Sequence, residues 1–208
     1  MRLGSEDALV VVDIQYDFLP GGSLAVAGGD EIIQPINAVA RRFANVVQTQ
    51  DWHPADHVSF ASNHPGTEPY QTIELPYGTQ ILWPDHCVVG TRGAQFSALL
   101  DLPNAQLVIR KGFHKTIDSY SGFREMDRKT HTGLAGYLRE RGIKRLFIAG
   151  LATDFCVAWT AEDAMDGGFE THVVEDATRA IDTNGSLEQA WSRMNAAGVG
   201  RLKVGDLL

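Results

Sequence analysis

Short apolar runs without polar interruption are the sequence feature that most limits what this chain can fold into. Residues Ala8-Leu9-Val10-Val11-Val12 are apolar at every position, and Leu146-Phe147-Ile148-Ala149 repeats the pattern late in the chain. A strand with one face in water would alternate polar and apolar residues, because its side chains point to opposite faces in turn. Unbroken runs of this length are typical of strands buried on both faces, as in a parallel sheet covered by helices.

Further strands and helices are expected to alternate along the chain. We expect strands at 45–50, 107–110, 171–174 and about 201–204, and helices at 31–43, 132–141, 156–165 and 186–197. This alternation predicts a three-layer α/β/α fold with a mostly parallel, six-stranded sheet and helices on both faces. The length of 208 residues, without repeats or low-complexity linkers, predicts a single domain over residues 1–208.

Residues 52–104 follow neither pattern. Gly and Pro are scattered through this segment, which also carries histidines and aromatic residues. A long irregular segment inside a compact domain is usually either functional or disordered. Its aromatic residues and histidines favour a function.

The overall charge limits the partners. The chain has 18 Lys and Arg against 26 Asp and Glu, so its formal net charge is -8 at pH 7. Nucleic acids and anionic membranes require basic surfaces, and no apolar run is long enough to cross a bilayer. Residues 1–7 lack a signal-peptide pattern, and two cysteines without such a signal favour reduced thiols. We therefore expect a cytoplasmic protein without a nucleic acid or membrane partner, for which a homo-oligomer is an allowed state.

Four polar residues follow predicted strands: Asp13, Asp51, Lys111 and Cys156. Ligands of open parallel sheets bind outside the carboxyl ends of the strands, so these residues should lie at one edge. Each alone is explained as a cap, turn or surface residue, but the set supplies a nucleophile, an acid/base and two charge partners. We predict that the Cys156 thiolate attacks a carbonyl, that Asp13 carries the proton and that Lys111 stabilises anions. Backbone N–H groups near Ala152 and Cys156 would form the oxyanion hole.

Cys156 opens a predicted helix, for which Thr153 or Asp154 would be the N-cap. A thiol in that position feels the positive end of the helix dipole, which favours the thiolate. An unpaired cysteine is also commonly a small buried apolar residue. This stretch alone leaves both roles open.

A second group of candidate ligands lies at the start of the irregular segment and within it. Asp51 and His53 are two apart, so on an extended segment they should face the same way. With His86 they form an O/N/N donor set that suits zinc, iron or manganese and leaves positions open for water or substrate. His57 is a further candidate. Cys87 is a weaker one, because a neighbour on an extended segment faces away from His86.

Five segments then carry a resemblance. They are Asp13-Ile14-Gln15-x-Asp17-Phe18, Gln50-Asp51-Trp52-His53-Pro54, Trp83-Pro84-Asp85-His86-Cys87, Arg110-Lys111-Gly112 and Gly150-Leu151-Ala152-Thr153-Asp154-Phe155-Cys156-Val157. Together they resemble the nicotinamidase family of isochorismatase-like cysteine hydrolases. The Asp, Lys and Cys motifs are common to that superfamily. The Asp-Trp-His-Pro and Trp-Pro-x-His-Cys motifs separate nicotinamidases from its metal-free members.

The resemblance implies a role for each matching residue. The implied catalytic triad is Asp13, Lys111 and Cys156, and the implied ligands of one divalent ion, zinc before iron or manganese, are Asp51, His53 and His86. The substrate's pyridine nitrogen would lie near the metal and its ring against Phe18 and Trp83. A cis peptide bond is implied between Leu151, a substrate-binding residue, and Ala152, an oxyanion-hole residue. Tyr120 and Phe123 lie in the part of the chain where the family lines its pocket.

The function implied by the resemblance is hydrolysis of nicotinamide to nicotinate and ammonia for NAD salvage, with pyrazinamide as a second substrate. Three alternatives stay open. The chain could be a sibling cysteine hydrolase of another small amide, or a hydrolase in which metal-bound water attacks and Cys156 is structural. It could also be a binder of small ligands without turnover, although the intact set of Asp13, Lys111 and Cys156 counts against that.

Overall fold

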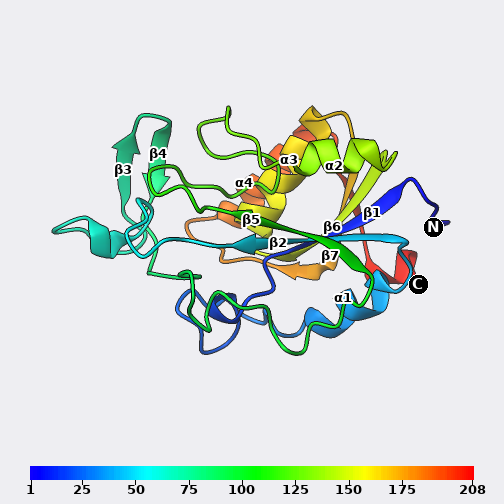
Figure 1. Cartoon of the computed structure of the whole chain (residues 1–208), viewed down its shortest axis with the longest axis horizontal. Helices are drawn as coiled ribbons and strands as arrows, with labels where there is room; N and C mark the ends of the chain where they lie inside the picture. The colour runs from blue at the N-terminus through cyan, green and yellow to red at the C-terminus, as the bar shows by residue number, and fades with distance from the viewer.

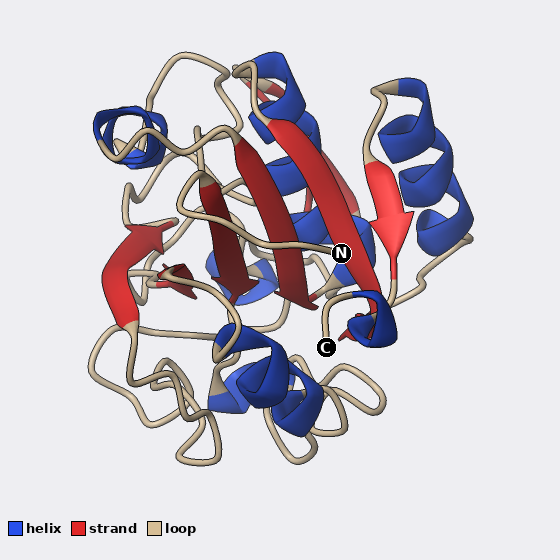
Figure 2. Ribbon diagram, turned by 90° about the vertical axis from the view of Figure 1, so that its right-hand side faces the viewer, coloured by secondary structure: helices blue, strands red, loops and turns tan.

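The computed structural model describes residues 1–208 and arranges them in three layers (Figures 1 and 2). The central layer is a six-stranded sheet in the order β5-β2-β1-β6-β7-β8, in which all neighbouring strands are parallel. Its strands are β1 (Asp7–Val12), β2 (Asn45–Asp51), β5 (Ala105–Lys111), β6 (Arg145–Leu151), β7 (Glu170–Arg179) and β8 (Gly200–Leu202). The predicted fold class is confirmed.

Helices cover both faces of the sheet. Figure 1 shows α1 (Ile33–Ala40) below it and α2 (Leu134–Glu140), α3 (Ala158–Asp166) and α4 (Ser186–Ala196) above it. Alternate residues of β1 pack into the two helical layers. Leu9 lies in the hydrophobic cluster that contains α1, and Val10 lies in the cluster that contains α2, α3 and α4. Every residue of β1 is therefore buried, which explains its unbroken apolar run. No helix in the structure has the length and apolar character needed to cross a membrane.

The irregular segment between β2 and β5 contains a hairpin that periodicity did not predict. Strands β3 (Thr72–Leu75) and β4 (Gly78–Ile81) pair antiparallel in a sheet of their own, which Figure 1 shows on the left, apart from the main sheet. The rest of the segment is loops and one 3-10 turn, η2 (Ala61–Asn63). Two other 3-10 turns are η1 (Tyr16–Phe18), after β1, and η4 (Val204–Asp206), near the end of the chain. The strands of the hairpin are four residues each, too short to give a clear alternating pattern.

Gly150, near the end of β6, allows the close approach of β1. Its φ is +123°, and a Cβ atom at this position would lie 2.1 Å from the carbonyl oxygen of Val12. Only glycine combines this backbone conformation with the absence of a side chain. The turn that follows β6 therefore begins directly against the end of β1.

The two-sided burial of the sheet gives a stability prediction with a matched control. Val47 of β2 is fully buried, whereas Val108 of the edge strand β5 is 43% exposed. Val47→Ala should lower the free energy of unfolding by about 2 kcal/mol or more, because it removes buried methyl groups and leaves a cavity. Val108→Ala should cost less than about 1 kcal/mol. Urea denaturation of both variants measures this, and equal losses would contradict the layered core.

Candidate active site and metal site

The ends of three neighbouring strands and the turn after a fourth bring the predicted catalytic residues together. Asp13 directly follows β1, and Asp51 and Lys111 are the last residues of β2 and β5 and are partners in the ladder. Cys156 lies in a π-helical segment, η3 (Thr153–Val157), after β6. All four side chains are buried. Since the strands are parallel and adjacent, their carboxyl ends meet at one edge of the sheet, as predicted.

Lys111 is at the centre of this group. Its Nζ lies 2.8 Å from Asp13 Oδ2 and 3.3 Å from Cys156 Sγ, and it also pairs with Asp51 Oδ1. It donates a further hydrogen bond to the carbonyl oxygen of Ser119 at 3.1 Å. Burial by itself lowers the pKa of Lys111, but the carboxylates of Asp13 and Asp51 outweigh it and raise the pKa well above its ordinary value. Lys111 is therefore a fully buried ammonium.

Asp13 is suited to hold a proton. Its Oδ1 accepts a hydrogen bond from Thr49 Oγ1 at 2.6 Å, whereas Oδ2 faces Lys111 and accepts no well-directed hydrogen bond. Burial raises the pKa of Asp13 more than the Lys111 ammonium lowers it. A carboxylate oxygen of Asp13 and the sulfur of Cys156 lie within 4.8 Å of each other. Asp13 is thus a carboxylate of raised pKa next to a thiol.

The resting state of Cys156 differs from the expectation based on the helix dipole. Burial raises the pKa of its thiol well above the ordinary value, although Lys111 acts in the opposite direction. The protonated thiol is therefore the resting form, and forming the thiolate requires a base. Cys87 also has a raised pKa through burial, but it packs in the core with its Sγ 4.0 Å from the carbonyl oxygen of Gly93.

The predicted N-cap before Cys156 is wrong. The N-cap position of η3 is Ala152, and no side chain caps this end. The chain has already turned at Thr153, because the first turn is π-helical and Val157 N–H bonds to Ala152 O. The carboxylate of Asp154 instead accepts hydrogen bonds from the backbone N–H groups of residues 181 and 182 and from the hydroxyl of Ser186. Asp154 thereby ties the turn to the loop before α4. The Leu151–Ala152 peptide bond is cis, which confirms that expectation.

The three predicted metal ligands also converge. Asp51 Oδ2 lies 3.7 Å from His53 Nε2 and 3.8 Å from His86 Nε2. The Nδ1 atom of His53 lies 2.7 Å from Gly112 O, and that of His86 lies 2.8 Å from Pro84 O. A carbonyl oxygen only accepts, so each Nδ1 carries the proton and each Nε2 presents a lone pair toward Asp51.

This donor set fits a divalent metal ion. Two ligand atoms that are each about 2.1 Å from a shared ion lie roughly 3–3.5 Å apart, close to the separations found here. Burial alone would raise the pKa of Asp51, but the Lys111 ammonium and, when its ring is protonated, His53 outweigh burial and hold the pKa well below its usual range, so the carboxylate is ionised. Gly112 leaves room for the His53 ring, since a Cβ atom there would lie 2.3 Å from His53 Cε1. Gln15 fixes the backbone of Asp51 by accepting from its N–H at 2.8 Å and donating to its carbonyl at 2.7 Å.

His57 makes other contacts. Its Nδ1 lies 2.7 Å from Ser59 Oγ and its Nε2 lies 3.2 Å from the carbonyl oxygen of Ile117. Burial and the neighbouring His53 lower the pKa of His57 to about 4. Its ring packs against that of His53, with centroids 4.3 Å apart. In this structure His57 supports the His53 ring and does not converge on Asp51 and His86.

A narrow pocket leads to Cys156 and to the metal ligands. It is lined by Phe18, Leu24, Asp51, His53, Trp83, His86, Asp118, Tyr120, Ala152, Phe155, Cys156 and Ile181. Phe18, Trp83 and Ala152 are where the sequence resemblance placed them. Sequence reasoning missed Leu24, Asp118, Phe155 and Ile181. Only Phe155 had a usable signal, because it directly precedes the candidate nucleophile.

Two residues expected at the pocket lie elsewhere. Leu151 is fully buried in the hydrophobic cluster that contains α1, since side-chain alternation along β6 points it into that layer. It is not among the lining residues, so a substrate contact by its side chain does not fit the structure. Phe123 packs in the opposite layer against Phe169, while Tyr120 reaches the pocket.

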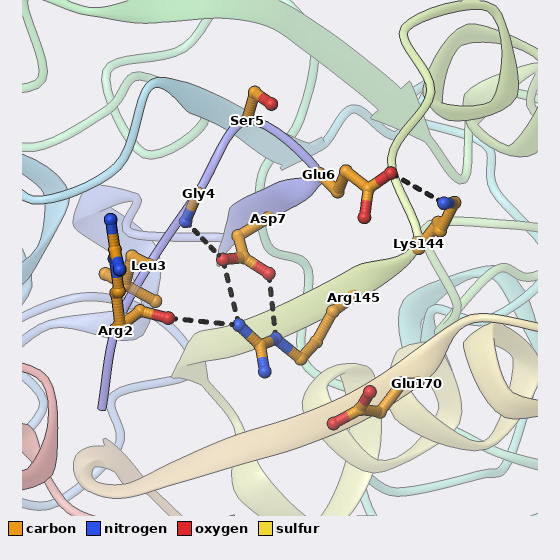
Figure 3. A pocket seen from close by; sticks show the side chains of 9 residues that line it. All are labelled: Arg2, Leu3, Gly4, Ser5, Glu6, Asp7, Lys144, Arg145 and Glu170. Atoms are coloured by element: carbon orange, nitrogen blue, oxygen red, sulfur yellow. Dashed lines mark hydrogen bonds and ion pairs between the residues drawn. The ribbon is translucent and has the colours of Figure 1, made fainter.

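A wider depression at the opposite edge of the sheet has a different character (Figure 3). It lies where β1, β6 and β7 begin, and four of its charged side chains form two pairs. Asp7 and Arg145 form two hydrogen bonds, of 2.8 and 2.9 Å, and Lys144 lies 2.6 Å from Glu6. None of the predicted site residues lies here. The pair of Asp7 and Arg145 links the first residue of β1 to the first residue of β6.

Comparison with known proteins agrees with the geometry of the site. Residues 7–203 match the model of the Isochorismatase domain. The chain is 58% identical to a nicotinamidase of Acinetobacter baylyi over 208 residues, which are 100% of this chain and 97% of that protein. A solved nicotinamidase/pyrazinamidase of Acinetobacter baumanii superposes with a TM-score of 0.98 at 59% identity, with 100% of both chains covered.

A more distant structure bears on the metal. The pyrazinamidase of Pyrococcus horikoshii, solved in complex with zinc, has a TM-score of 0.79 and 38% identity, and the match covers 95% of this chain and 99% of that one. The identities and coverage are far above what a shared fold alone requires. The chain therefore belongs to the isochorismatase family and, within it, to the nicotinamidases.

Proposed function

We propose that this protein hydrolyses nicotinamide to nicotinate and ammonia through a thioester on Cys156, and that it serves NAD salvage in the cytoplasm. The observation that carries the proposal is the position of Lys111. Its ammonium contacts the carboxylate of Asp13, the candidate nucleophile Cys156 and the metal-binding carboxylate of Asp51. The nucleophile, the acid/base group and a ligand of the metal site are thus all held around one buried cation. We also propose that residues 1–208 act as one domain.

The pocket suits a flat aromatic amide. Trp83 and Phe155 meet edge to face with centroids 4.9 Å apart, and Phe18 lies 5.5 Å from the ring of His86. Flat apolar walls favour an aromatic ring over an aliphatic chain, and the few polar groups can fix its orientation. Asp51, His53 and His86 would hold one divalent ion, for which we propose zinc. When bound, this ion supplies a Lewis-acidic partner for the pyridine nitrogen.

The first half of the reaction would form the thioester. Asp13 takes the proton of the Cys156 thiol, and the sulfur attacks the carboxamide carbon. The carbonyl oxygen becomes an oxyanion, which the backbone N–H groups of Ala152 and Cys156 stabilise, with the Lys111 charge close by. As the C–N bond breaks, Asp13 gives its proton to the leaving nitrogen. Ammonia departs, and the nicotinoyl group stays on sulfur.

The second half would release the acid. Asp13, again a carboxylate, takes a proton from water, and the water oxygen attacks the thioester carbon. The C–S bond then breaks, its electron pair returns to the sulfur, and Asp13 returns the proton to Cys156. Throughout both steps Lys111 keeps an anion-stabilising charge beside whichever of Asp13 and Cys156 is ionised. The balance is one amide and one water converted to one carboxylic acid and one ammonia.

Incubation with nicotinamide tests the proposal directly. The metal-loaded protein should release nicotinate and ammonia in equal amounts, and it should accept pyrazinamide, whose ring also carries nitrogen. Benzamide has the same shape without a ring nitrogen and is the matched control, expected to react much more slowly. Preference for an aliphatic amide, or for benzamide, would instead favour a sibling hydrolase with a different substrate.

Two single substitutions, Cys156→Ala and His86→Ala, should abolish or lower activity for different reasons. Cys156→Ala should abolish turnover while metal content and nicotinamide binding persist, because the ring-binding contacts remain. His86→Ala should lose metal and substrate affinity together, because the ion needs all its ligands. Elemental analysis and calorimetric titration with nicotinamide measure both properties. Substantial turnover by metal-loaded Cys156→Ala would favour the rival mechanism, in which metal-bound water attacks and Cys156 is structural.

Removing the proton carrier should also slow the reaction. Asp13→Asn keeps the shape of the side chain but not its basicity, so kcat/KM should fall at least about a hundredfold. Asp56→Asn is a suitable control, because Asp56 pairs with Lys115 on the surface. A rate near that of the unmodified protein, measured for folded Asp13→Asn, would remove Asp13 from the mechanism.

The two thiols should differ in reactivity. Cys156 lines the pocket beside the Lys111 ammonium, whereas Cys87 is fully buried in the core. Iodoacetamide should therefore modify Cys156 first, and nicotinate should slow that reaction. Peptide mapping by mass spectrometry reads out both sites. Preferential labelling of Cys87 would argue against the assignment.

A further inference from the structure

The hairpin of β3 and β4 contacts the pocket through one buried amide. Of the residues in its two strands, only Gln80 is buried, with 1% of its surface exposed. All the other strand residues are exposed or half-buried. A buried amide needs hydrogen-bond partners, because leaving it without them costs stability. The partners of Gln80 therefore show what the hairpin holds in place.

Those partners belong to the pocket wall. Gln80 Nε2 lies 2.8 Å from Asp118 Oδ2, 2.6 Å from the carbonyl oxygen of Ile81 and 3.4 Å from the hydroxyl oxygen of Tyr120, so its two N–H groups are shared among three acceptors. Asp118 and Tyr120 both line the pocket. On the other side of the amide, Gln80 Oε1 accepts from the hydroxyl of Tyr77 at 3.0 Å. Tyr77 lies in the turn of the hairpin and does not line the pocket.

Tyr120 extends this contact to a further lining residue, Trp83. Its hydroxyl oxygen also accepts from Trp83 Nε1 at 3.0 Å, so it receives N–H groups from both Trp83 and Gln80. The rings of Tyr120 and Trp83 are edge to face with centroids 6.3 Å apart. Burial raises the pKa of Tyr120 well above its ordinary value, so the phenol stays neutral. A chain of side chains thus runs from the hairpin turn through Gln80 and Tyr120 to Trp83.

We infer that Gln80 is a positioning residue for substrate binding, which sets the orientation of Asp118, Tyr120 and Trp83 around the substrate ring. The inference rests on the proposed function, because it assigns the wall to binding of the nicotinamide ring. Gln80 has no hydrogen bond to Asp13, Lys111 or Cys156, whose contacts are with one another and with Thr49, Asp51 and Ser119. Loss of its amide should therefore weaken binding of the ring and leave the bond-forming steps nearly unchanged.

Steady-state kinetics of a Gln80 variant test this role, because they give KM and kcat separately. Gln80→Met keeps the length of the side chain and removes all its hydrogen bonds, so KM for nicotinamide should rise about tenfold or more, since a hydrogen bond to a charged group is lost. The kcat should stay within about threefold of the original, because ground-state and transition-state binding fall together. Thr79→Ala is the control in the same strand, as the hydroxyl of Thr79 bonds only to Glu74 on the surface and its loss should change neither value.

A second variant tests the direction of the effect without altering Gln80. Tyr77→Phe removes the donor to Gln80 Oε1 and should raise KM in the same direction but less. If Gln80→Met is already present, adding Tyr77→Phe should raise KM less than it does in the original protein, because only the long 3.4 Å hydrogen bond that the Tyr77 hydroxyl accepts from Asp118 N–H then remains to be lost. Should Gln80→Met fail to fold, the KM of Tyr77→Phe alone is the test, and an unchanged KM would count against the role of Gln80. Calorimetric titration of nicotinate into the variants in a Cys156→Ala background measures the same loss of affinity without turnover.

The outcomes are distinct from failure of the proposed function. If the original protein does not hydrolyse nicotinamide, the proposed function is wrong. If the original protein does hydrolyse it, a KM within twofold of the original in the folded variants overturns only the role of Gln80. A fall in kcat at unchanged KM also overturns it, because that pattern would place the effect on the chemical steps.

Discussion

The buried ammonium of Lys111 is the interaction on which the site depends. A cation removed from water is costly unless charged partners and hydrogen bonds surround it, and Lys111 has two carboxylates and a carbonyl oxygen. The carboxylates are in turn buried and require the cation. Loss of Lys111 would leave two buried carboxylates without their shared cation. The group is thus a single unit, and Cys156 is the one member of it that lies next to Lys111 without a charge of its own at rest.

The same ammonium gives the two neighbouring carboxylates different properties. Asp51 pairs with the Lys111 ammonium, which together with His53 in its protonated form holds the pKa of Asp51 well below the ordinary range. Asp13 has only the Thr49 hydroxyl and Lys111, and burial leaves its pKa raised. One carboxylate is therefore suited to bind a cation and the other to exchange a proton. This division of roles between two aspartates follows from their surroundings and not from their residue type.

Much of this could be predicted from the sequence. The runs at Ala8–Val12 and Leu146–Ala149 predicted a sheet covered on both faces, and parallel strands place their last residues at one edge. Asp13, Asp51, Lys111 and Cys156 follow from that rule, and His53 and His86 from ligand chemistry and the family motifs. Local patterns could not predict contacts that depend on long-range packing. The π-helical first turn moved the helix start away from the predicted N-cap, and Leu151 points into the core because of its place on β6.

The residues that the sequence did not reveal share a physical cause. Asp118, Ile181 and Gln80 lie on loops or on a short hairpin, where no periodicity indicates which side chains point inward. Asp118 and Ile181 line the pocket, and Gln80 bonds to its wall, only because the segment between β2 and β5, the loop after β5 and the loop after β7 converge there. Asp154 is similar, since its bonds to the loop before α4 replace the capping role expected of it.

The central claim is that Cys156, set beside Lys111 and Asp13, attacks the amide itself. The most direct measurement is rapid acid quenching during turnover of nicotinamide, followed by intact-mass analysis and peptide mapping. A nicotinoyl thioester on Cys156 is expected to appear before the steady state and to disappear as substrate is exhausted. Nicotinate release with no acyl group on Cys156 at any time, or with the acyl group on another residue, would contradict it.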